Sequence, residues 1–111
     1  MKKGYILHED PEDFFQSDGV SVMMFSRAAA KRIFELAGSR GIEIWRYEGG
    51  ILKDGVFQAR LDAIWDRLNS HTGPEFLEEG NLRAAHAIVG QHESYNSFTI
   101  TAGPLKKAQP R

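Results

Sequence analysis

The sequence predicts an α+β fold, with an antiparallel sheet of about four to five strands and two main helices packed on it. Apolar residues recur at helical spacing in two segments, residues 26–37 and 82–89. Between and after these segments, apolar and polar residues alternate with the period of two that is typical of strands. Glycine and aspartate pairs separate the strands and favour hairpins, and hairpins with helices on one side make an α+β domain.

The N-terminal quarter of the chain predicts two short strands. Residues 4–8 favour a first strand, and the acidic residues 9–13 favour a turn after it. Val20, Val22 and Met24 alternate with their neighbours, which indicates a second strand.

The first main helix follows Ser26, a residue type that favours the N-cap position. Its apolar stripe is formed by Ala29, Ala30, Ile33, Phe34 and Ala37. Gly38 and Gly41 then predict its end, because a residue in the left-handed conformation commonly terminates a helix.

A hairpin is predicted next. Its first strand begins at Ile42 and runs into Gly49-Gly50, and its second covers residues 56–60 after Asp54-Gly55. Two interpretations remain for the segment that follows. The spacing of Leu61, Ile64, Trp65 and Leu68 favours a short helix, whereas a strand continuing through Ala63 is the alternative.

The remaining third of the chain predicts a loop, a helix and a strand. Residues 69–80 are polar, contain Pro74 and favour a loop. The second main helix carries the stripe Leu82, Ala85, His86, Ile88 and Val89 and is weakened by Gly90. Phe98 and Ile100 indicate a last strand, and the basic segment from Gly103 onward is expected to fray.

Length and composition predict one domain, residues 1–103, followed by a flexible basic tail, residues 104–111. The chain has no cysteine, so a disulfide framework and a thiolate zinc site are both excluded. Apolar runs are only a few residues long, and the start of the chain lacks a signal-peptide core. A soluble cytoplasmic protein without membrane contact is therefore expected.

The charge distribution predicts a basic partner. Five basic residues lie at the ends of the chain, and residues 4–105 hold nine basic and fifteen acidic groups, a formal charge of −6. Direct nucleic-acid binding needs clustered lysine and arginine, so this balance disfavours it. An acidic surface suits a cationic protein, and ordinary solubility charge is the simpler alternative.

The catalytic and cofactor motifs that the sequence approaches each lack a required residue. Gly50 and Gly55 have the glycine spacing of a phosphate-binding loop, but the required lysine is replaced by Val56. His92-Glu93 begins like a zinc-protease helix, but Asn96 replaces the second histidine. His86 lies on the apolar stripe and is expected to be a hydrogen-bonded core residue. No cofactor or metal is predicted, and the best candidate for acid–base catalysis is His71 with Glu75 or Glu78.

The segment from Ser26 to Thr101 resembles a known protein family. The resemblance runs through Ser26-x-x-Ala29-Ala30, Ala37, Gly41, Ile44, Glu48-Gly49-Gly50, Phe57, Ala63, Trp65, Glu78, Leu82 and Tyr95-x-x-Phe98-x-Ile100-Thr101. These residues are similar to the immunity protein of the E-group colicin that cleaves tRNA anticodon loops, and to its relatives in contact-dependent inhibition systems. Residues 1–25 have no counterpart in the colicin branch and count as an N-terminal extension.

The resemblance implies a small α+β protein that binds the ribonuclease domain of its cognate toxin and blocks the active site. Such a domain is basic because it holds RNA phosphates, in agreement with the acidic central region. The expected contacts are one aromatic residue and six acids: Trp65, Glu48, Asp54, Asp62, Asp66, Glu78 and Glu79. The alternatives are a core position for Trp65, a solvated face for the acids, and for the chain an RNA-processing enzyme or an adaptor protein without a toxin partner.

Overall fold

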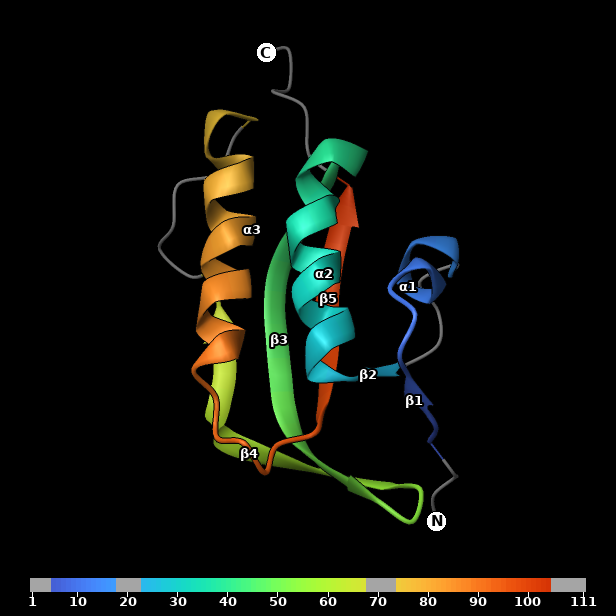
Figure 1. The fold of residues 1–111 in the computed structure, drawn as a ribbon. Helices are drawn as coiled ribbons and strands as arrows, with labels where there is room; N and C mark the ends of the chain where they lie inside the picture. Colours follow the sequence, from blue (N-terminus) through green and yellow to red (C-terminus); the bar gives the residue numbers. More distant parts are fainter. Residues whose placement is uncertain (1–4, 18–22, 68–73, 105–111) are drawn as a thin grey trace.

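The computed structural model describes residues 5–17, 23–67 and 74–104, with the backbone alone for residues 74–78 and 104. Within these residues five strands form one sheet, and two long helices lie side by side on one of its faces (Figure 1). The predicted α+β class is confirmed. The strand order is β1-β2-β5-β3-β4, and every neighbouring pair is antiparallel except the parallel pair β1 and β2.

The strands differ greatly in length. The two nearest the N-terminus have two residues each, whereas the three that build most of the sheet have eight to twelve. In chain order they are β1 (Leu7–His8), β2 (Met24–Phe25), β3 (Ile42–Lys53), β4 (Val56–Asp66) and β5 (Ser97–Pro104). The predicted residues Val20 and Val22 lie outside the described part of the chain.

Helix α2 (Arg27–Ala37) begins and ends as predicted. The Ser26 side chain accepts a hydrogen bond from the Ala29 N–H, which satisfies one of the free donors at the helix start. A short 3-10 helix, η1 (Gly38–Arg40), extends α2, and Gly41 ends it with a φ of 71°. The five residues of the predicted apolar stripe are all buried against the sheet.

The β3–β4 hairpin turns at Asp54 and Gly55, whose φ angles of 54° and 78° suit a tight hairpin turn. Gly49 and Gly50 are not turn residues, because they lie inside β3. They are small for another reason. A Cβ on Gly49 would lie 2.4 Å from the Phe98 ring, and one on Gly50 would lie 2.1 Å from the Gln58 carbonyl oxygen.

The helix predicted over residues 61–68 is wrong, and the alternative, a strand through Ala63, is correct. The β3–β4 register shifts between Glu48 and Gly50, so extra residues of β4 face Gly49. This irregularity interrupts the alternation of apolar residues and produces a chance helical spacing. Leu61 is consequently 90% exposed, whereas Ala63 is fully buried.

Helix α3 (Pro74–Val89) begins well before the predicted helix, so the loop predicted over residues 69–80 is wrong from Pro74 onward. Proline suits the first position of a helix, where its missing N–H has no partner to lose. Gly80 is buried in α3 because the Arg67 guanidinium lies across it. Both residues suggest a loop in the sequence, yet Pro74 suits the first turn of the helix and Gly80 leaves room for Arg67.

The end of α3 is fastened by Arg27 from the start of α2. Its guanidinium donates to the carbonyl oxygens of Ile88, Gln91, His92 and Tyr95 at 2.5–2.9 Å. These are carbonyl groups that the helix end and the following turn leave without helical partners. One side chain therefore holds the connection between α3 and β5.

The acidic N-terminal segment is a turn followed by a helix, α1 (Glu12–Gln16), which was not predicted. Arg40 holds this helix by two hydrogen bonds of 2.7 Å to the Glu12 carboxylate and by stacking over the Phe15 ring. The hydrogen bonds between Arg40 and Glu12 raise the pKa of Arg40 and lower that of Glu12. Further down, the Tyr5 N–H donates to Gly55 in the hairpin turn, so the hairpin tip lies beside the N-terminal segment (Figure 1).

Candidate functional site

The sheet has two faces with different surroundings. Helices α2 and α3 lie on the helix-covered face, and none of the described helices lies on the other, which we call the open face (Figure 1). Strand register assigns side chains to each face, because directly opposed residues point the same way. Tyr47 faces Ile100 and Trp65 on the helix-covered face, whereas Glu48 faces Thr99 and Ile64 on the open face.

Three charged residues form a cluster on the open face. Arg46 lies between Glu48 on its own strand and Asp66 on β4, and donates to the two carboxylates at 2.9 and 2.6 Å. These hydrogen bonds, to Glu48 first and Asp66 second, raise the pKa of Arg46. The three side chains are about one-third exposed, so the cluster is fixed in position and still reaches solvent.

A β-bulge adds Trp45 to the open face. The β3–β5 register shifts between Ile44 and Arg46, which places Trp45 as an extra residue on the same side as Arg46. Its ring lies over Gly103, where a Cβ would come within 2.5 Å of the indole. The indole N–H donates to the Glu43 carboxylate at 3.2 Å. Trp45 is 38% exposed, and its indole is held by the contact of its six-membered ring with Gly103 and by the hydrogen bond to Glu43.

A buried polar cluster of Asn81, Arg67 and Glu43 binds the backbone of β3 at the bulge. The Asn81 side chain accepts from the Ile44 N–H and donates to the Ile42 carbonyl, both at 3.0 Å. Arg67 donates to the Ile44 carbonyl at 2.7 Å and to Asn81 at 2.7 Å, and its nearest carboxylate is Glu43 at 3.8 Å. Burial lowers the pKa of Arg67, and the Glu43 charge opposes that effect.

The predicted acidic contacts with described side chains are spread over four places rather than one. Glu48 and Asp66 share the open face, Asp54 lies at the hairpin tip, and Glu79 lies on α3, where it pairs with Arg83 at 2.7 Å. Asp62, on β4, accepts from the Tyr95 hydroxyl at 2.7 Å, and this bond raises the pKa of Tyr95. The side chain of Glu78 lies outside the described part of the structure.

Trp65 is on the helix-covered face and packs half-buried against the core. Its ring stacks on Tyr47 with centroids 6.1 Å apart. The tryptophan that the open face presents is Trp45, which was not among the contacts expected from the sequence. The alternation of β3 already places Trp45 on the face opposite Ile42 and Ile44, together with Tyr47. The bulge, which is bound by Asn81 and Arg67, changes the facing of the residues that follow: Arg46 joins Trp45 on the open face, and Tyr47 lies on the helix-covered face.

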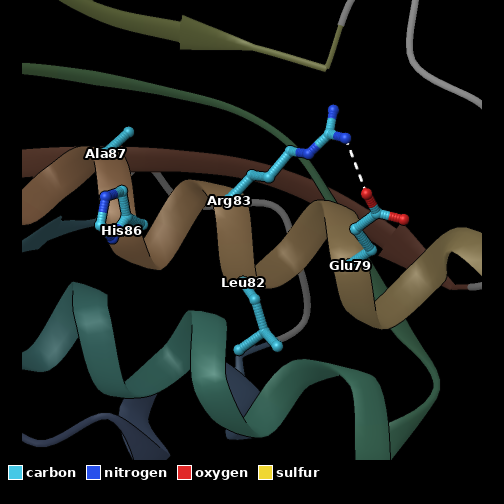
Figure 2. A pocket seen from close by; sticks show the side chains of 5 residues that line it. All are labelled: Glu79, Leu82, Arg83, His86 and Ala87. Atoms are coloured by element: carbon cyan, nitrogen blue, oxygen red, sulfur yellow. Dashed lines mark hydrogen bonds and ion pairs between the residues drawn. The ribbon is translucent and has the colours of Figure 1, made fainter.

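A hollow lies on the outer surface of α3 and is lined by Glu79, Leu82, Arg83, His86 and Ala87 (Figure 2). His86 is exposed there, so the expectation of a core histidine is wrong. The apolar stripe of α3 runs instead through Ala84, Ala85 and Ile88, which are buried against α2 and the sheet. Of the predicted stripe, Ala85 and Ile88 are buried, whereas Leu82 and Val89 are exposed.

Among the described residues, no group of three or more histidine, aspartate and glutamate side chains could hold a metal ion. His71, the proposed acid–base residue, lies outside the described part of the chain, as do the side chains of Glu75 and Glu78. No helix within the described ranges is both long and apolar enough to cross a membrane.

The chain is similar over most of its length to a known protein. No family model matches the chain. The immunity protein CdiI of Burkholderia pseudomallei is 36% identical over 95 residues, which cover 86% of this chain and 87% of the relative. A match of this length extends beyond residues 26–111, so it includes part of the first 25 residues. Because identity is this high over nearly the whole of both proteins, the chain belongs to the family of the CdiI immunity proteins.

Proposed function

We propose that this chain is an immunity protein that binds and neutralises the toxin domain of a contact-dependent inhibition system, and that this toxin is a ribonuclease acting on tRNA. The relationship to CdiI, 36% identity over 86% of the chain, carries the proposal. The protein acts by binding alone, inside the cell that makes the toxin, and covers the toxin's active site. It needs no cofactor for this role and contacts neither nucleic acid nor membrane.

Charge supports a nuclease as the target. A ribonuclease domain presents lysine and arginine to RNA phosphates, and carboxylates can form the same charge-assisted hydrogen bonds. Residues 4–105 of this chain carry a formal charge of −6. The acids reach solvent on several elements, and two of them are fixed on the open face. An inhibitor of this charge is attracted to the surface that RNA would occupy, which raises its association rate.

The proposal implies that a large secreted protein carrying the toxin domain at its C-terminus is encoded beside this chain, and the test is co-expression with that domain. Cells that produce this domain alone should stop growing, and cells that also produce this chain should grow normally. An unrelated nuclease toxin provides the control, and this chain should give no protection against it. Growth arrest despite abundant folded chain would contradict the immunity function.

A second measurement separates immunity from the kind of toxin. The purified toxin domain should cleave tRNA, and an equimolar amount of this chain should stop the cleavage. If the domain arrests growth and is neutralised by this chain but leaves tRNA intact, the immunity function stands and the ribonuclease assignment is wrong.

A further inference from the structure

We propose that the toxin docks on the open face of the sheet, on a surface formed by Trp45, Arg46, Glu48, Ile64, Asp66 and Thr101, which we call the open-face patch. Trp45 is its apolar anchor, and Glu48 and Asp66 receive basic side chains of the partner. The inference rests on the proposed function and names its surface. The partner is a protein domain with lysine or arginine around an apolar recess.

The first argument is the arrangement of charge in the patch. Arg46 donates to one oxygen of the Glu48 carboxylate and to one oxygen of the Asp66 carboxylate. Among the described residues, the second oxygen of each carboxylate has no hydrogen-bond partner. A carboxylate accepts several hydrogen bonds, so each can bind a lysine or arginine of the partner without releasing Arg46. The cluster has two acids and one base, and its charge favours a cationic partner.

The second argument is that these groups are already in position. Glu48 and Asp66 come from different strands and are joined through Arg46, so little side-chain freedom is lost when a partner binds them. The acid on α3 offers a contrast. Glu79 and its partner Arg83 are both more than half exposed and are one helical turn apart, an arrangement that holds exposed side chains only weakly.

The third argument is the exposed tryptophan. Trp45 is the one tryptophan on the open face, and tryptophan is enriched among residues that dominate binding energy. Contact with Gly103 and the hydrogen bond to Glu43 hold its ring. Ile64 and Thr101 flank the charged cluster on β4 and β5, and both are directly opposed to residues of β3 that belong to the patch. The result is a polar rim beside a rigid apolar surface, as in many protein interfaces.

The test measures binding of the full chain to the toxin domain that it protects against in the co-expression experiment, by calorimetry and by association kinetics at two salt concentrations. Trp45→Ala should weaken binding by at least about thirtyfold, the range of an interface hot spot. The double variant Glu48→Gln/Asp66→Asn should weaken it about tenfold or more at low salt, mainly through the association rate, and should reduce the salt dependence.

The matched control is Glu35→Gln on α2. Glu35 is as exposed as Asp66, 30% for each side chain, and also pairs with basic residues, Lys31 and Arg32. It lies outside the patch, and affinity should stay within about twofold of the wild type, as for most residues outside a hot spot. Circular dichroism and thermal unfolding verify that each variant is folded. If Trp45→Ala does not fold, the isosteric double variant decides.

The outcomes separate the two proposals. If the wild-type chain does not bind the toxin domain, the proposed function fails. If the wild type binds and the folded patch variants bind equally well, immunity stands and the open-face patch is overturned. The patch is also overturned if Glu79→Gln on α3 weakens binding while the patch variants do not.

Discussion

Strand β3 presents two different kinds of surface on its two sides. On the helix-covered face, Ile44 and Tyr47 are fully buried and pack against the helices and β5. On the open face, Trp45 and Glu48 each keep 38% of their surface exposed. The apolar burial that stabilises the domain is therefore concentrated on one side of the strand. Side chains on the other side can be shaped for recognition at little cost to folding.

The two faces are linked at the Trp45 bulge, where Asn81 of α3 and Arg67, just after β4, bind the backbone of β3. These residues hold the bulge that puts Trp45 and Arg46 on the same face. The comparison therefore predicts large stability effects on the helix-covered face, intermediate effects at this junction and small effects on the open face.

The largest effect is expected from Phe98→Ala on β5. Phe98 is fully buried, packs edge-on against Tyr47 and leaves no room for a side chain at Gly49. Its removal should lower the free energy of unfolding by about 3–5 kcal/mol. The adjacent Thr99, on the open face, is the control, and Thr99→Ala should cost about 1 kcal/mol or less. Urea unfolding of both variants measures the difference, and equal losses would contradict the division between the faces.

The same division explains how much of the fold could be predicted from the sequence. Helix α2 was predicted within a residue because all its signals are local: the Ser26 cap, the apolar stripe and Gly41 after its end. The hairpin turn at Asp54-Gly55 was also local, since both residues supply positive φ angles. Where neighbouring residues in the chain determine the structure, pattern and propensity were sufficient.

Predictions failed where distant residues determine the structure. Gly80 suggested a loop, but it lies in a helix and leaves the space that the Arg67 side chain occupies. Residues 61–68 suggested a helix because the irregular pairing of β4 with β3 alters the strand period. The candidate site was predicted only in part: Glu48 and Asp66 share the open face, whereas Trp65 packs against the core. The bulge that places Arg46 beside Trp45 on the open face, and Tyr47 in the core, has no local signal in the sequence.

The second largest loss of stability is expected from Arg67→Met, at the junction between the two faces. Glu43 and Arg67 are only 6% and 7% exposed, so the variant leaves a buried carboxylate without its cation. The free energy of unfolding should fall by about 3 kcal/mol. Replacing Glu43 as well, by Gln, should restore part of the loss, because the uncompensated charge is removed. Chemical unfolding of the two single variants and the double variant forms the cycle, and strict additivity would show that the two residues do not interact.

A smaller effect on the free energy of unfolding is expected from Gly80→Ala, and its sign depends on Arg67. In an exposed helix this substitution stabilises by about 1 kcal/mol. Here the added methyl group would lie 1.8 Å from the Arg67 guanidinium, so Arg67 has to leave its site over α3. We expect a net loss of about 1–2 kcal/mol. In the Arg67→Met background the clash is removed, and the substitution should become neutral or stabilising. A loss of equal size in both backgrounds would show that Arg67 does not require the glycine.

The smallest expected effect is a change in the pH dependence of stability, which involves two tyrosines in different surroundings. Burial on the helix-covered face raises the pKa of Tyr47, whereas the hydrogen bond to Asp62 raises that of Tyr95. An unfolded tyrosine ionises near pH 10, at about its ordinary pKa, so both groups favour the folded state below that pH. Stability should then fall as pH rises from about 10 through the raised values, because the unfolded chain loses these protons first.

Tyr47→Phe and Tyr95→Phe test this pH dependence separately. Each variant should lose part of the alkaline decline, measured as the urea midpoint between about pH 8 and pH 11, a window around the ordinary tyrosine pKa. The absorbance of ionised tyrosine gives an independent titration of the same groups. The contribution of Tyr47 to the alkaline loss of stability should be unaffected by salt, because it arises from burial. The contribution of Tyr95 should become smaller in high salt, because the Asp62 carboxylate that accepts its hydrogen bond is exposed. Equal salt responses would mean that the two tyrosines are shifted by the same cause, against the contrast between buried and exposed surroundings.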